Sequence, residues 1–155
     1  MSKRLALFCA LPLLVSTSAF PRSPSALPPV VQAEIKKAQS ACEPKLPKLS
    51  PGFIIEGDVN GDGVKDYVLD YGAFRCGRQL FFCGTAGCLT QVFASLSDGG
   101  HVKVLDENVR NIKFRLLKGR PAMILDLHGT DCGKVGAAPC SATLFWNGER
   151  FSPAN

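Results

Sequence analysis

The sequence predicts an α+β domain with one short N-terminal helix and an antiparallel meander of about six or seven strands, stapled by disulfides. Three observations predict this class. Apolar residues recur at helical spacing in only one early segment. Short apolar or alternating segments, separated by Gly, Pro and Asp, fill the rest of the chain. Six cysteines follow an export signal, which favours a disulfide framework.

Residues 1–19 have the features of a secretory signal peptide. Lys3 and Arg4 precede an apolar run at residues 5–15, and small residues follow at 16–19. The run is too short to span a membrane, and we expect cleavage after Ala19. Lipid attachment at Cys9 is disfavoured because Phe8 stands where a lipoprotein signal has a small residue. The mature protein is therefore expected in the periplasm or outside the cell.

The chain divides into the signal peptide (1–19), a Pro-rich leader (20–29) and one domain (30–155). Removal of 19 of the 155 residues leaves 136, enough for a single core. Loss of Lys3 and Arg4 lowers the formal charge from +5 to +3, too little to indicate nucleic-acid binding. We expect a monomer.

After the leader, a helix is predicted at about residues 30–42, because Val31, Ile35 and Ala38 are spaced along one face. Pro44 and the prolines that follow prevent its continuation. Strands are predicted on both sides of residues 58–66 and at 91–96, 101–105, 111–117, 122–127 and 141–146. Residues 123–125 are the most apolar and should be central, while residues 112–116 alternate as a half-exposed strand. Asn147-Gly148 predicts a closing hairpin.

Residues 58–66 have the oxygen pattern of a calcium loop. Oxygen ligands stand at alternate places around the turn glycine Gly63, and they are Asp58, Asn60, Asp62, the Val64 carbonyl and Asp66, the last direct or through water. The twelfth place, a bidentate glutamate in an EF-hand, is Leu69, so we expect weak binding with a Kd of roughly 0.1 to 1 mM. The alternative is a polar hairpin, because Asn60-Gly61 and Asp62-Gly63 are both favoured turn pairs.

Apolar residues flank this motif on both sides, which indicates strand, loop, strand. Residues 58–66 resemble the calcium loop of FG-GAP or VCBS repeats in integrin-like propellers, although the chain contains no second copy. At whole-chain level, a set of short motifs resembles small uncharacterised exported proteins of Gram-negative bacteria, which implies a periplasmic location but no mechanism. These motifs are the loop, Asp70-Tyr71-Gly72, the segment 83–88, Leu127-His128-Gly129 and Trp146-Asn147-Gly148.

Six cysteines remain after signal removal, and sequence alone allows 15 pairings. Proximity along the chain favours Cys83 with Cys88, Cys132 with Cys140, and then Cys42 with Cys76. Zinc is disfavoured because four residues separate Cys83 from Cys88 and no second spaced pair completes a tetrahedral site.

Three functional classes follow from these features. The first is a non-catalytic, calcium-binding module whose partner is an unknown protein or envelope polymer. The second is an inhibitor of an envelope-directed hydrolase, with residues 84–87 as the contact. The third is a small hydrolase using His128 and Asp131, the only candidates for a general base and its neighbour. An acidic partner would suit the cationic residues of the later strands, which are Lys103, Arg110, Lys113, Arg115, Lys118 and Arg120.

Overall fold

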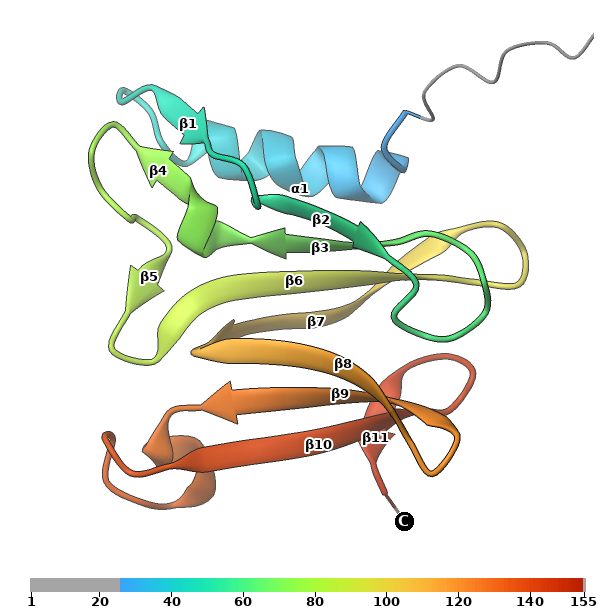
Figure 1. Cartoon of the computed structure of the whole chain (residues 1–155). Helices are drawn as coiled ribbons and strands as arrows, with labels where there is room; N and C mark the ends of the chain where they lie inside the picture. Colours follow the sequence, from blue (N-terminus) through green and yellow to red (C-terminus); the bar gives the residue numbers. More distant parts are fainter. Residues whose placement is uncertain (1–25, 155) are drawn as a thin grey trace, which may run out of the picture.

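The computed structural model of the protein describes residues 26–154. The expected signal peptide, Cys9 and residues 20–25 of the expected leader lie outside the described residues. The described chain forms three layers, in which a single α-helix, α1 (Pro29–Ser40), lies on one side of a central sheet and a second sheet lies on the other (Figure 1). No helix within residues 26–154 is long and apolar enough to cross a membrane.

All strand pairings are antiparallel. The central sheet runs β2 (Ile54–Gly57), β3 (Asp66–Asp70), β6 (Gly87–Ser95), β7 (His101–Val109), with β5 (Cys83–Gly84) beside the start of β6. The second sheet is a meander of β8 (Asn111–Leu117), β9 (Arg120–Leu127), β10 (Cys140–Trp146) and β11 (Phe151–Pro153). The short strands β1 (Pro47–Leu49) and β4 (Phe74–Cys76) pair separately, and 3-10 turns occupy Tyr71–Ala73 and Gly129–Cys132.

The middle strands of the central sheet, β3 and β6, are buried on both faces, which explains their apolar character. Successive side chains of a strand point to opposite faces. Tyr67 and Leu69 therefore pack toward α1, beside Val31 and Ile35, whereas Val68 packs toward Met123 of the second sheet. Burial of such side chains is worth about 1.5 to 3 kcal/mol each. Two separate cores, one on each face, hold the three layers together.

A polar network also ties α1 to the central sheet. The Gln91 amide donates to Glu34 at 3.0 Å, and Lys103 forms ion pairs with Glu34 at 3.3 Å and with Asp106. Burial raises the pKa of Glu34, but hydrogen bonds from Gln91 and Lys103 and the nearby positive charge outweigh it, so this pKa lies below its ordinary value. Lys103 is thus engaged in the fold and is not part of a free cationic face.

The structure confirms the α+β class, the helix and the closing hairpin. The helix begins at Pro29, and the Asn147 side chain accepts hydrogen bonds from the Glu149 and Arg150 amides in the β10–β11 turn. The predicted strand number is wrong, because eleven strands form within residues 26–154. Several of the additional strands are only two or three residues long and carry no readable periodicity. In addition, Leu116 is 70% exposed instead of facing the core.

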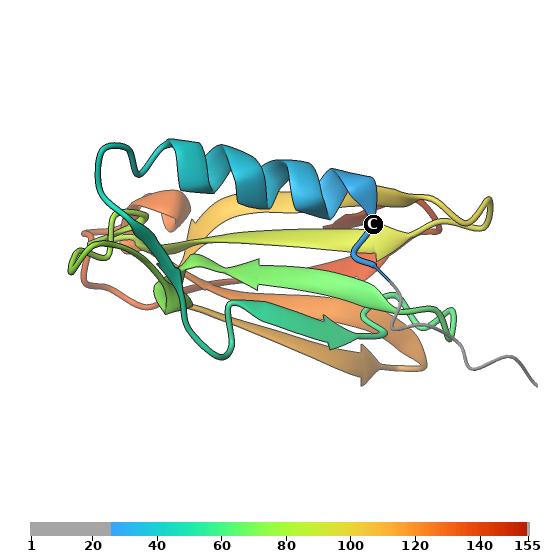
Figure 2. The same cartoon turned by 90° about the horizontal axis from the view of Figure 1, so that it is seen from above.

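The two sheets are stacked face to face, and β2 and β8 lie on the same side of the stack (Figure 2). Each is the outermost strand of its sheet. The chain passes between the sheets at Arg110, whose backbone N–H donates to the Asp126 carbonyl at 2.8 Å. β2 and β8 therefore form the same edge of the stack.

Candidate functional site

The acidic loop joins β2 to β3, and its backbone is held by alternate side chains. Asp58 accepts hydrogen bonds from the amides of Gly61 and Gly63, at 2.6 and 2.8 Å. The Asn60 side-chain oxygen accepts from the Asp62 amide at 3.1 Å, and Asp62 accepts from the Val64 amide at 2.7 Å. Both glycines have positive φ, +81° and +78°, which favours glycine at these turns. These hydrogen bonds curve the loop backbone around the side chains of Asp58, Asn60 and Asp62.

Asp66 anchors the loop from within the protein. It is fully buried, and its Oδ2 accepts from the amides of Val59 at 2.6 Å and Asn60 at 3.2 Å. Its Oδ1 accepts from the Ser95 amide at 2.7 Å and lies 2.7 Å from the Ser95 hydroxyl. Because every oxygen already has protein donors, any contribution of this carboxylate to an ion would pass through water.

Ser95, at the end of β6, brings two carboxylates together. Its hydroxyl lies 2.7 Å from both Asp62 Oδ2 and Asp66 Oδ1, yet a hydroxyl has one proton to donate. The Asn60 amide donates to the Ser95 carbonyl and to Asp62, each at 3.1 Å. Ser95 could not be predicted from the loop motif, because it lies 29 residues from Asp66 and its only sequence signal is a polar residue at the end of an apolar strand.

The loop carries negative charge without a compensating cation. Within residues 26–154, no Lys, Arg or His nitrogen lies within 4.0 Å of the carboxylates of Asp58, Asp62 or Asp66. The nearest lysine in sequence, Lys65, pairs with Glu56. Partial burial raises the pKa of Asp62, but hydrogen bonds from Ser95, the Val64 amide and Asn60 outweigh it and lower this pKa overall. The carboxylate form of Asp62 is therefore favoured.

The oxygen atoms of this loop are of the kinds that calcium binds, which are carboxylate, amide and carbonyl oxygens. In the described part of the chain, no three His, Cys, Asp or Glu side chains gather as a metal-binding group. An ion here would depend also on Asn60 and on the carbonyl of Val64, a residue that is 48% exposed. Leu69, in the twelfth place, is fully buried in the helix-side core and offers no ligand.

His128 and Asp131 form a local turn. The Asp131 carboxylate accepts from the His128 amide at 3.2 Å, and His128 Nδ1 is 2.7 Å from the Thr130 hydroxyl. The ring lies against Gly136, where an added Cβ would be only 2.5 Å from its atoms. The neighbouring hollow is lined by Arg110, Asp126, Lys134 and other residues, but not by the His128 ring. These contacts fix the histidine ring within this turn.

The six cysteines form the three pairs that proximity predicted: Cys42–Cys76, Cys83–Cys88 and Cys132–Cys140. Three disulfides are typical of proteins that fold in an oxidising compartment. Gly87, within the segment 84–87, packs directly on the corner between β7 and β8, since a Cβ there would lie 2.1 Å from the Val109 carbonyl oxygen. This segment is therefore partly fixed, although Gly84 and Thr85 are exposed.

Four of the predicted cationic residues lie on the hairpin of β8 and β9, and none forms an ion pair within 4.0 Å in residues 26–154: Lys113, Arg115, Lys118 and Arg120. The Arg120 guanidinium stacks over the Phe145 ring at 4.9 Å. Arg110, in contrast, donates to the backbone carbonyl of Gly136 at 2.8 Å. The hairpin is therefore a cationic surface whose charges have no acidic partner within 4.0 Å among the described residues.

Comparisons with known proteins identify no relative, because no protein-family model, curated protein or solved structure matches the chain.

Proposed function

We propose that the protein is an exported, calcium-binding, disulfide-stabilised module of the bacterial envelope that binds a partner without catalysis. The observation that carries the proposal is the loop at residues 58–66. It contains three carboxylates, and those of Asp62 and Asp66 share the Ser95 hydroxyl, with no cationic nitrogen within 4.0 Å among the described residues. Two carboxylates about 5 Å apart repel by roughly 3 kcal/mol at an effective dielectric near 20, which favours uptake of a divalent cation.

In this proposal Asp58, Asn60, Asp62 and the Val64 carbonyl hold the ion, and Asp66 acts through water. When bound, calcium supplies positive charge that offsets the repulsion among the carboxylates. The protein residues fix the loop between β2 and β3, so the binding energy appears as folding stability. An ion in this place has a structural role.

The proposed partner is an acidic polymer of the envelope. Support comes from the cationic hairpin, where Lys113 and Arg115 are exposed side chains on an outer strand and carry no paired acid within the described residues. Such a surface attracts polyanions, and the attraction weakens as salt rises.

Calcium titration of the oxidised protein tests the proposal. With a Kd of 0.1 to 1 mM, 10 mM calcium stabilises the fold by about 1.4 to 2.7 kcal/mol. For a domain of this size, that corresponds to a rise in melting temperature of roughly 5 to 10 °C relative to a sample with chelator. Isothermal titration calorimetry measures the stoichiometry, which we expect to be one ion.

The matched variants are Asp62→Asn and Asp98→Asn. Asp98 also accepts a backbone amide two residues on, from Gly100 at 2.9 Å, but lies in the β6–β7 turn outside the proposed ligand set. We expect Asp62→Asn to lose most of the calcium-dependent shift and Asp98→Asn to retain it. The absence of calcium uptake at 10 mM, or an equal loss in both variants, would contradict the proposed ion site.

A further inference from the structure

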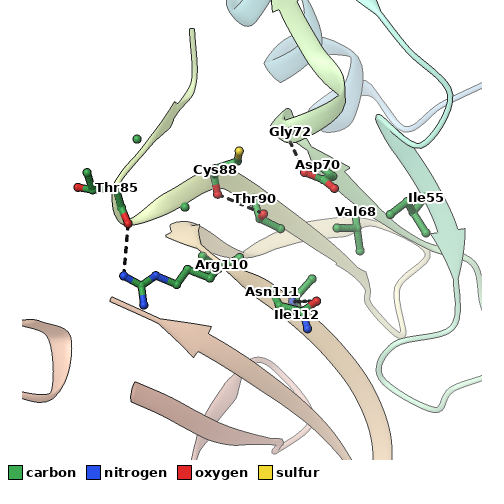
Figure 3. Close-up of a pocket in the computed structure, with 13 residues that line it drawn as sticks. Ile55, Val68, Asp70, Gly72, Thr85, Cys88, Thr90, Arg110, Asn111 and Ile112 are labelled. Atoms are coloured by element: carbon green, nitrogen blue, oxygen red, sulfur yellow. Dashed lines mark hydrogen bonds between the residues drawn. The ribbon is translucent and has the colours of Figure 1, made fainter. Parts of the chain in front are cut away.

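A cavity of about 430 Å³ lies between the two sheets, at the end that holds the Cys83–Cys88 disulfide (Figure 3). Its apolar wall comes from both sheets and consists of Ile55, Val68, Val109 and Ile112. Its polar side chains include Asp70, Thr90 and Arg110. This volume is within the range of sites for small organic ligands, roughly 300 to 1,000 Å³.

The cavity extends to the edge of the two sheets that is formed by β2 and β8. Residues of β2 and of β8 both line it, so a ligand reaches it from solvent between these strands. Ile55 is 46% exposed, so part of an apolar side chain is open to solvent at this edge. The space is therefore a cleft with an apolar mouth.

Asp70 contributes an acceptor with spare capacity. Its Oδ1 accepts from the Gly72 amide at 2.8 Å, whereas no described residue donates to its Oδ2. No cationic nitrogen within residues 26–154 lies within 4.0 Å of this carboxylate. Thr90 is opposite Asp70 in the β3–β6 register and is 3% exposed. The Thr90 hydroxyl makes only a long, 3.5 Å bond to the Cys88 carbonyl, so its oxygen is also open to a donor.

The Arg110 and Asn111 side chains of the cavity are already engaged in hydrogen bonds. The Arg110 guanidinium donates to the carbonyls of Gly136 at 2.8 Å and Thr85 at 3.5 Å, and Figure 3 shows it directed toward Thr85, away from Asp70. The Asn111 side chain accepts from the Ile112 amide and donates to Asp126. Asp70 and Thr90 thus offer two neighbouring open acceptors, one of them charged.

We propose that this cavity binds a primary amine with a short aliphatic body. The ammonium group donates to Asp70 Oδ2 and Thr90 Oγ1, and the aliphatic body lies against Val68 and Ile112. A simple alkylamine and an apolar amino acid share this chemistry. An amino acid would add a carboxylate beside the ammonium, and the Arg110 guanidinium is directed away from that position.

Titration of the ¹⁵N-labelled oxidised protein with n-pentylamine tests the proposal. We expect saturable shifts of the Val68, Thr90 and Ile112 amides, whereas pentanoate and 1-pentanol should bind at least about tenfold more weakly because they lack the ammonium. Norleucine distinguishes the two sources: tighter binding than pentylamine supports an amino acid, and weaker binding supports a simple amine. Chelator is present throughout, so the result does not depend on the calcium loop.

Asp70→Asn removes the charge but keeps an oxygen for the Gly72 amide, so the fold should be preserved. We expect this variant to bind pentylamine at least about tenfold more weakly. Asp98→Asn, which has the same turn chemistry outside the cavity, should bind as the unmodified protein does. Equal binding of pentylamine and pentanol, shifts outside the cavity, or an Asp70→Asn variant that binds normally would each overturn the proposal.

Discussion

Replacement of Asp66 by Ala is expected to be the most damaging change in the acidic loop. The substitution leaves three buried backbone N–H groups without their acceptor, those of Val59, Asn60 and Ser95. Each unsatisfied group costs about 1 to 3 kcal/mol, so the expected loss is about 3 to 9 kcal/mol. This is comparable with the total stability of an ordinary domain, about 5 to 15 kcal/mol.

Urea unfolding followed by circular dichroism measures this loss, with chelator present so that no ion contributes. Asp66→Asn keeps one oxygen and should fall between the Ala variant and the unmodified protein. Asp98→Ala is the control, because exposed Asp98 holds one amide and should cost about 1 kcal/mol or less. A loss for Asp66→Ala no larger than that of this control would show that the three amides do not depend on the Asp66 carboxylate.

Three further predictions concern other parts of the molecule. Gly87→Ala places a Cβ 2.1 Å from the Val109 carbonyl oxygen at a φ of +111°, so we expect the free energy of unfolding to fall by about 2 kcal/mol or more in melting experiments. Gly84→Ala is the control and should be nearly neutral, because no atom lies within 4 Å of the added Cβ. Glu34 has a lowered folded pKa, so its stabilisation is complete above its ordinary pKa of 4.5 and is lost as pH falls through the lower folded value; urea unfolding between pH 3 and 6 should show a flatter dependence for Glu34→Gln. Finally, Lys113→Ala with Arg115→Ala should weaken salt-sensitive retention on a polyanionic resin and change stability by less than about 0.5 kcal/mol, whereas unchanged retention would argue against the cationic hairpin.

Local sequence patterns were sufficient to predict the elements whose structure depends on residues close together in the chain. On α1, the buried face carries Val31, Ile35 and Ala38, as their spacing predicts, and it packs against the central sheet. The strands on both sides of the acidic loop pair as expected, with Ile55 opposite Val68. The disulfides follow proximity, because two of the three pairs close loops within one hairpin or turn.

The features that the sequence did not reveal depend on distant residues. β7 continues through polar residues to Val109 because they pair with β6, and Asp106 opposite Gln91 joins the network under α1. Ser95 reaches the acidic loop only because β3 and β6 are neighbours in the sheet. The cavity at Asp70 requires the stacking of two sheets, which no periodicity of a single strand encodes.

The outer position of β8 has a consequence for solubility. A last strand exposes unpaired backbone groups, which are a template for association with another chain. Lys113 and Arg115 alternate along this strand as exposed charges. Mutual repulsion between identical strands would therefore discourage edge-to-edge pairing of two copies, and neutral β-branched residues at these two positions should promote aggregation.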